Sequence, residues 1–257
     1  MNEDAFVVVN IDESLTEITL ADKDCNIDLQ EKFELQLKNI DRESFAWEIG
    51  GLISKTLGME NKKRSCKSIA ISFPGNVDPL SGKIVKSPIN KKLEDFSISD
   101  ILKNNINCPI GIESHINNAL IGENWQGIAQ SVKNIIYVEL QNLFNISLLI
   151  ENQIVRGEEQ LAGELDISNE VKQMQHLGGK RLEEIIQKVA AAALLLDTGL
   201  IIIDTNKSQS KDIISLLDKE LKAKGREIPI KEPKLVQQNI TIGCLKMALT
   251  LNFENIN

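Results

Sequence analysis

The chain of 257 residues contains few cysteines, few histidines and few aromatic side chains. Its four cysteines are far apart in the sequence and form no Cys-x-x-Cys motif. This spacing argues against a disulfide framework or a zinc ribbon, and it favours the reducing cytosol. Aromatic residues make up only 4% of the chain. The chain therefore has few aromatic side chains on which the bases of a single-stranded nucleic acid could stack.

Long apolar runs and basic clusters are also missing. The longest apolar run, Val189–Leu196, is far too short to cross a bilayer. The acidic start of the chain lacks the apolar core of a signal peptide. The formal net charge is −8, and the only basic run is Lys62–Arg64. We therefore expect a cytoplasmic protein with no direct nucleic-acid partner and no membrane partner.

What the sequence does contain is a repeated α/β pattern. In each half of the chain, β-branched runs come first and stretches with helical spacing follow. This duplication predicts two α/β lobes around a cleft. We place the N-terminal lobe at residues 1–113 plus 240–257 and the C-terminal lobe at residues 114–239. The strands predicted in the first half are 6–11, 15–20, 34–38, 68–73, 83–86 and a short one at 110, and the helices are 45–57 and 99–106.

One junction concentrates polar chemistry. The short strand signal around Ile110 ends in Glu113-Ser114-His115, and a helix is predicted to begin near His115. In open α/β sheets, ligands bind at the carboxyl ends of the strands. The sequence therefore predicts a carboxylate, a hydroxyl and an imidazole at a binding edge.

Three motifs in this chain resemble those of the ROK family of repressors and sugar kinases. They are the run Ile69–Asp78 (IAISFPGNVD), the run Glu113–Glu123 (ESHINNALIGE), and Arg156-Gly157 followed by Ala162-Gly163-Glu164. The resemblance implies an actin-like ATPase fold, which is ribonuclease H-like, and usually a dimer. The resemblance also implies a binding site for a sugar and a binding site for MgATP.

The sequence departs from the family where nucleotide phosphates would bind. The family's first phosphate turn, Asp-x-Gly-Gly-Thr, keeps Asp12 and Thr16 here but has lost both glycines. The second, glycine-rich turn corresponds to Gln141–Ser147, and the third Gly-Gly corresponds to Asp204-Thr205. Phosphate is approached closely by backbone N–H groups only where no Cβ intervenes. Asp12 and Thr16 are thus a degenerate nucleotide site, and we expect no cofactor.

The catalytic position is altered as well. His115 stands where the resemblance places the catalytic aspartate, and although imidazole can act as a general base, we expect it to be inactive without a phosphate site. The family's zinc motif is missing, so no metal is expected.

The positions that bind the sugar in this family are matched better in this sequence than the phosphate turns are. The resemblance implies sugar contacts from six residues, which are Gly75, Asn90, Glu113, Ser114, His115 and Glu164. For several positions a local role competes with this one. Gly75 can serve a tight turn, Asn117 can cap the helix, Glu164 can pair with a cation and Asp12 can be a turn carboxylate.

These patterns favour a non-catalytic, ROK-like regulatory or sensor protein that binds a sugar or a protein partner, as a homodimer or as a heterodimer with a relative. The first predicted strand begins close to Met1, so a preceding DNA-binding module is not expected. Two alternatives stay open. One is an ATP-dependent sugar kinase with a divergent site that uses MgATP, and the other is a structural partner of an active relative.

Overall fold

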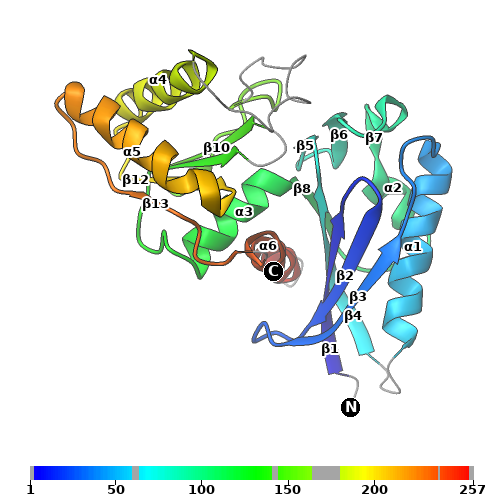
Figure 1. Cartoon of the computed structure of the whole chain (residues 1–257). Helices are drawn as coiled ribbons and strands as arrows, with labels where there is room; N and C mark the ends of the chain where they lie inside the picture. The colour runs from blue at the N-terminus through cyan, green and yellow to red at the C-terminus, as the bar shows by residue number, and fades with distance from the viewer. Residues whose placement is uncertain (1–2, 60–63, 141–143, 164–179, 237, 255–257) are drawn as a thin grey trace. The chain divides into compact units, whose positions relative to one another are not determined.

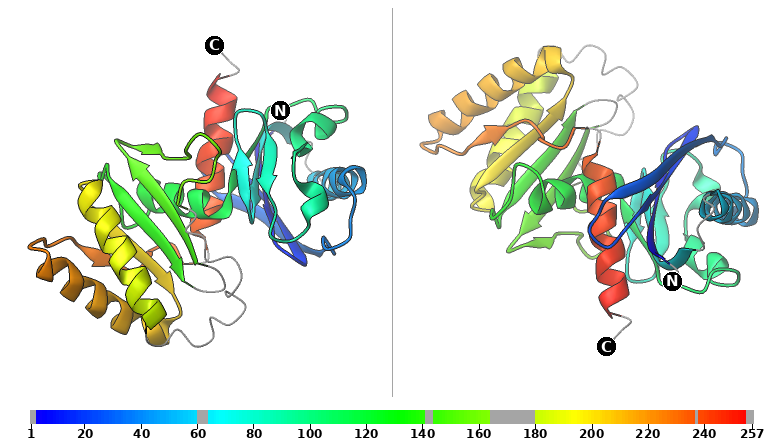
Figure 2. Two further views of the ribbon diagram at one scale, coloured as in Figure 1. Left: turned by 90° about the horizontal axis from the view of Figure 1, so that it is seen from above. Right: turned by 90° about the horizontal axis from the view of Figure 1, so that it is seen from below.

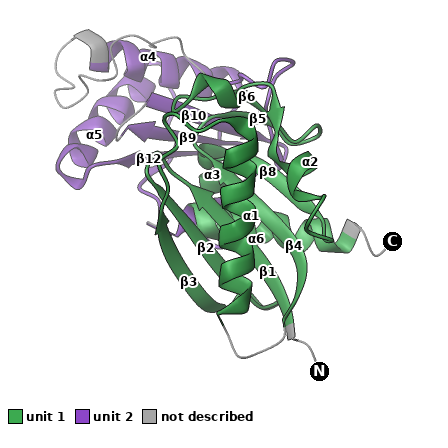
Figure 3. Ribbon diagram, turned by 90° about the vertical axis from the view of Figure 1, so that its right-hand side faces the viewer, with its two compact units in different colours: residues 1–122, 240–257 green, residues 123–239 purple. Residues whose placement is uncertain are grey.

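The computed structural model describes residues 3–59, 64–140, 144–163, 180–236 and 238–254 (Figure 1). The chain forms two compact units, shown in different colours in Figure 3. Unit 1 comprises residues 1–122 and 240–257, and unit 2 comprises residues 123–239. Within the described residues, no helix combines the length and the apolar character needed to cross a membrane.

Unit 1 is built on a five-stranded sheet with the strand order β3-β2-β1-β4-β8. Three strands, β1, β4 and β8, run parallel, while β1, β2 and β3 form an antiparallel meander. The strands are β1 (Glu3–Ile11), β2 (Leu15–Ala21), β3 (Ile27–Glu34), β4 (Arg64–Phe73) and β8 (Ile110–Ser114). A small second sheet contains β5 (Asn76–Asp78), β6 (Lys83–Lys86) and β7 (Phe96–Ser97), and a 3-10 turn, η1, spans Lys91–Leu93.

Strand alternation divides the side chains of this sheet between two faces. One set, which includes Val9 and Ile71, joins a core with α1 (Arg42–Gly58) and α2 (Ile98–Leu102). The other face is covered by α6 (Asn239–Glu254), seen in both views of Figure 2. There the Ser68 hydroxyl donates to the Ala248 carbonyl at 2.6 Å. The parallel strands are thus buried on both sides, as their apolar runs require.

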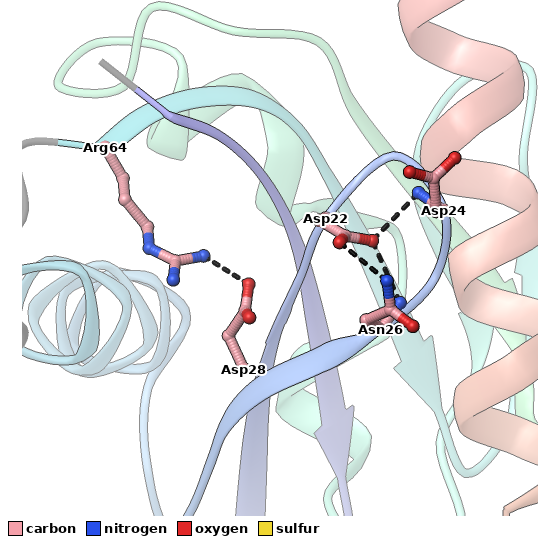
Figure 4. A network of polar contacts seen from close by, with 5 residues as sticks. All are labelled: Asp22, Asp24, Asn26, Asp28 and Arg64. Atoms are coloured by element: carbon pink, nitrogen blue, oxygen red, sulfur yellow. Dashed lines mark hydrogen bonds and ion pairs between the residues drawn. The ribbon is translucent and has the colours of Figure 1, made fainter. Parts of the chain in front are cut away.

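The turn between β2 and β3 is fixed by one carboxylate (Figure 4). Asp22 accepts hydrogen bonds from the backbone N–H groups of Asp24 and Asn26 and from the Asn26 side chain. The Asn26 amide is the main reason that the pKa of Asp22 lies below its ordinary value. Nearby, Arg64 of β4 pairs with Asp28 of β3. Side chains rather than glycines therefore hold this hairpin.

Unit 2 contains a second five-stranded sheet with the order β11-β10-β9-β12-β13. Its strands are β9 (Ile135–Leu140), β10 (Phe144–Ile150), β11 (Gln153–Ile154), β12 (Leu200–Thr205) and β13 (Ile230–Lys231). The helices α4 (Lys180–Leu195) and α5 (Lys207–Ala223) pack against this sheet through residues such as Val189 and Leu217. Because this core is separate from that of unit 1, each unit has its own interior.

Helix α3 (His115–Trp125) carries the chain from unit 1 into unit 2. The sequence placed the boundary after Glu113, whereas the contacts divide the chain after Gly122. The difference arises because α6 contacts the first turns of α3. A Cβ on Gly243 would lie 2.0 Å from the Asn118 carbonyl oxygen.

The predicted strand at residues 34–38 is wrong, since β3 occupies residues 27–34 instead. Leu35 and Leu37 alternate with polar residues and are buried, but the segment that holds them is not a strand. The alternation of apolar and polar residues in this segment therefore reflects burial of the leucines and not pairing in a sheet.

Candidate functional site

The carboxyl ends of β1, β4 and β8 bring polar side chains together in unit 1. Asn10 pairs with Ser72 across β1 and β4, and Ser72 pairs with Glu113 across β4 and β8. Ser72 and Glu113 are buried, and Asn10 is partly buried. A row of three polar residues thus lies next to the apolar runs near the carboxyl ends of these strands.

Glu113 and Ser114 shape the start of α3. The Glu113 carboxylate accepts hydrogen bonds from the Ser114 backbone and from the Asn117 side chain, both at 2.9 Å. The Ser114 hydroxyl accepts from the Asn117 backbone at 3.4 Å, as an N-cap does. Ser114 therefore takes the capping role that the sequence assigned to Asn117, and Asn117 orients the carboxylate.

His115 is the first residue of α3, and its imidazole lies against the ends of β1 and β4. Burial lowers the pKa of His115 to about 4, although the Asp12 carboxylate and the backbones of Ile11 and Ser72 act in the opposite direction. The imidazole is consequently neutral at pH 7. Its Nε2 atom is buried and has no hydrogen-bond partner among the described residues.

Two asparagines that the sequence analysis did not single out complete this arrangement. The Asn118 side chain donates to the Ser72 hydroxyl at 3.0 Å. The Oδ1 atoms of Asn118 and Asn10 are buried without a partner in the described part of the chain. Together with His115 Nε2, three orphaned polar atoms thus come from residues that each adjoin Ser72.

Buried polar atoms normally find a partner in the protein, in water or in a ligand. We call Asn10, Ser72, Glu113, His115 and Asn118 the strand-end cluster. It offers acceptors, a neutral imidazole and a carboxylate, a combination that can bind hydroxyl groups. For Asn10, the signal in the sequence was its position as a single polar residue directly after the apolar run Phe6–Val9.

Gly75 and Asn90 have local structural roles. A Cβ on Gly75 would lie 2.2 Å from the Lys86 carbonyl oxygen, so the β4–β5 turn requires glycine. The buried Asn90 amide donates to the carbonyls of Leu37 and Ile40 at 2.9 and 2.8 Å, and its Oδ1 accepts from the Lys92 backbone. A sugar contact by Asn90 stays a prediction, and only Oδ1 retains capacity for it.

Asp12 and Thr16 lie at the β1–β2 turn. Asp12 is exposed, its carboxylate accepts from the Glu13 backbone, and its own N–H donates to the Leu15 carbonyl. Thr16 is buried, and its hydroxyl has no partner among the described residues. Glu164, the remaining predicted sugar contact, lies outside the described residues.

In unit 2, side chains stand where the resemblance placed the third phosphate turn, Asp204-Thr205. The Tyr137 hydroxyl donates to the Asp204 carboxylate at 2.6 Å and accepts from the Asn239 side chain at 2.8 Å. Burial, aided by Asp204, raises the pKa of Tyr137. The Thr205 hydroxyl donates to the Leu140 carbonyl. Residues 141–143 lie outside the described residues.

This arrangement does not fit a nucleotide phosphate. The Asp204 carboxylate adds negative charge at the end of β12, and it is held in place by Tyr137. In the described part of the chain, no three His, Cys, Asp or Glu side chains are grouped so that they could hold a metal ion.

A model of the ROK family matches residues 8–166. A β-glucoside kinase of Klebsiella pneumoniae is 30% identical over 100 residues, which cover 39% of this chain and 34% of the kinase. A xylose repressor of Caldicellulosiruptor bescii is 29% identical over 97 residues, which cover 38% of this chain and 24% of the repressor. The aligned segments thus span only about a quarter to a third of these relatives.

Solved structures show that the fold is shared along almost the whole chain. A ROK family transcriptional regulator, described as a homologue of the E. coli MLC protein, has a TM-score of 0.79 at 13% identity and covers 99% of this chain and 80% of its own. The ROK hexokinase of Thermus thermophilus has a TM-score of 0.72 at 16% identity, over 98% of this chain and 99% of its own. The α/β, actin-like ATPase fold expected from the sequence is thereby confirmed.

Proposed function

Because this chain belongs to the ROK family, whose relatives here include sugar kinases and xylose repressors, we propose that it is a non-catalytic sugar sensor. It binds a sugar at the strand-end cluster of unit 1 and passes that signal to a protein partner. It works as a dimer in the cytoplasm, and it uses no cofactor.

The observation that carries this proposal is the Asp204 carboxylate at the end of β12. The carboxylate is fixed by the Tyr137 hydroxyl, which is itself held by Asn239. Phosphoryl transfer depends mainly on positioning and on electrostatic stabilisation around the phosphate. A fixed carboxylate opposes both, because it repels the phosphate oxygens.

The strand-end cluster supports sugar binding without phosphoryl transfer. Glu113 is already oriented by Ser114 and Asn117, so little conformational freedom would be lost when a hydroxyl group binds. The orphaned atoms of Asn10, His115 and Asn118 supply further polar contacts.

Thermal-shift measurements test the proposal. The panel contains MgATP alone and then glucose, xylose, fructose, a β-glucoside and amino sugars. A ligand at 100 times its dissociation constant stabilises a protein by about 2.7 kcal/mol. For a chain of this size that corresponds to roughly 5–10 °C. We expect a shift of this size with at least one sugar and none with MgATP.

A matched pair of variants assigns the response to the site. Glu113→Gln removes the charge of the oriented carboxylate, whereas Glu48→Gln makes the same change at an exposed position on α1. The sugar shift should disappear in the first variant and persist in the second. Equal responses in both variants would place the sugar elsewhere.

The kinase alternative predicts a clear MgATP shift and phosphorylation of the sugar that His115→Ala abolishes. Such a result would overturn the sensor proposal. A structural partner of an active relative would show no shift with any compound of the panel, and it would form a heterodimer with that relative in sedimentation experiments.

A further inference from the structure

Two cysteines that are 42 residues apart in the chain meet in unit 1. The Sγ atoms of Cys66 and Cys108 lie 3.3 Å apart and share a hydrogen bond. Both thiols are free, and both side chains are partly buried. Cys66 lies on β4, and Cys108 lies two residues before the start of the neighbouring strand β8.

A β-bulge explains why the two sulfurs face each other. In the pairing of β1 with β4, Ala5 lies opposite Cys66 and Phe6 lies opposite Ser68, so Lys67 is an extra residue. A bulge of this kind redirects the side chains on one side of it. Ser68 points to α6, where it binds Ala248, while Cys66 packs with Cys108 against the core on the α1 side. Without the bulge, strand alternation would put Cys66 on the same face as Ser68.

We propose that Cys66 and Cys108 are a redox modification site, which low-molecular-weight disulfides such as oxidised glutathione convert into an intramolecular disulfide. Bond formation needs the sulfurs to move from 3.3 Å to about 2.05 Å. That is a small displacement for two partly buried side chains at the ends of neighbouring strands.

The chemistry is a two-step thiol–disulfide exchange. The Cys108 thiolate attacks one sulfur of the small disulfide, and one thiolate leaves. The Cys66 thiolate then attacks the Cys108 sulfur of the mixed disulfide and expels the second. Two protein thiols lose two protons and two electrons, and the small disulfide becomes two thiols. Cys108 serves as the first nucleophile because the hydrogen bond from Cys66 lowers its pKa, while the same contact raises the pKa of Cys66.

The test uses the intact, fully reduced chain in buffers with increasing ratios of oxidised to reduced glutathione. Free thiols are alkylated under denaturing conditions, and the protein is analysed by mass spectrometry after digestion. We expect the number of free thiols to fall from four to two, and the cross-linked peptide to contain Cys66 and Cys108. The thermal midpoint of the oxidised protein should rise by several degrees, because the cross-link restricts the unfolded chain.

Serine variants show whether the pair is specific. Cys66→Ser should abolish the cross-link and leave a stable mixed disulfide on Cys108, whereas Cys25→Ser should leave the cross-link intact. Four free thiols throughout the titration would overturn the proposal, and so would a cross-link through Cys25 or Cys244. The wild-type mass measurement decides the question even where a variant folds poorly.

Discussion

At the scale of single residues, His115 links the candidate site to pH. Its pKa is about 4 in the folded protein and about 6.5 in an unfolded chain. Below pH 6.5 the unfolded state therefore binds more protons, and stability falls as the pH drops from 6.5 towards 4. Between pH 7 and pH 5 this residue should cost about 2 kcal/mol of the free energy of unfolding.

Urea unfolding at several pH values measures this effect. The variant His115→Gln cannot titrate, so its free energy of unfolding should fall by about 2 kcal/mol less than that of the wild type between pH 7 and pH 5. His176→Gln removes the only other histidine and serves as the comparison. A wild type and a His115→Gln variant with the same pH dependence would show that folding does not lower the pKa of His115.

Asn90 gives a second prediction at the residue scale. Asn90→Ala leaves the carbonyls of Leu37 and Ile40 without their donor, and we expect a loss of about 2–3 kcal/mol in stability. The exposed Asn105→Ala should change stability by less than about 0.5 kcal/mol. Chemical denaturation checks both variants, and similar small losses would mean that the two contacts contribute little.

The sequence predicted part of the site at this scale. The polar residues at the carboxyl end of β8 could be predicted directly from the sequence, because ligands bind at strand ends in α/β folds. The sequence could not show that the Asn90 amide donates to the carbonyls of Leu37 and Ile40, since these residues lie 53 and 50 positions before Asn90. Cys66 and Cys108 were likewise hidden, because their meeting depends on one extra residue in β4.

At the scale of elements, a glycine governs how α6 meets α3. A Cβ on Gly243 would lie 2.0 Å from the Asn118 carbonyl oxygen, whereas a Cβ on Gly51 of α1 would meet nothing within 4 Å. Both positions are helical, so alanine gains helix propensity at each. Gly51→Ala should stabilise the protein by about 0.5–1 kcal/mol, and Gly243→Ala should destabilise it by about 1–3 kcal/mol.

Thermal unfolding of the two variants, side by side, checks this contrast. Equal stabilisation by both substitutions would mean that α6 can move away from Asn118 at little cost. A large loss in Gly243→Ala would show that this contact fixes α6 against the strand-end cluster, of which Asn118 is a member.

Most elements were predictable because their apolar spacing is regular. The predicted strand 83–86, for example, matches β6. β3 escaped prediction because the charged Glu31 lies between Leu29 and Phe33 on its inner side. An edge strand such as β3 tolerates this charge, which a central strand would not.

At the scale of the whole molecule, the two separate cores make a prediction about unfolding. Leu20→Ala in β2 and Leu217→Ala in α5 each remove a fully buried leucine, one from each core. Each change should cost about 2–5 kcal/mol. Native-state hydrogen exchange should accelerate in β1 and β4 for the first variant, and in β9 and β12 for the second. Equal acceleration in both sheets for either variant would contradict two independent cores.

The order of the chain has a consequence for biosynthesis. Unit 2 is a continuous segment, whereas the sheet of unit 1 receives its last covering helix, α6, only after unit 2 has been made. At roughly 5–20 residues per second, the face of the nascent sheet that α6 covers stays exposed for on the order of ten seconds. During that time it can bind a ribosome-bound chaperone, so that unit 1, whose sheet is translated before unit 2, becomes native only after unit 2 has been made.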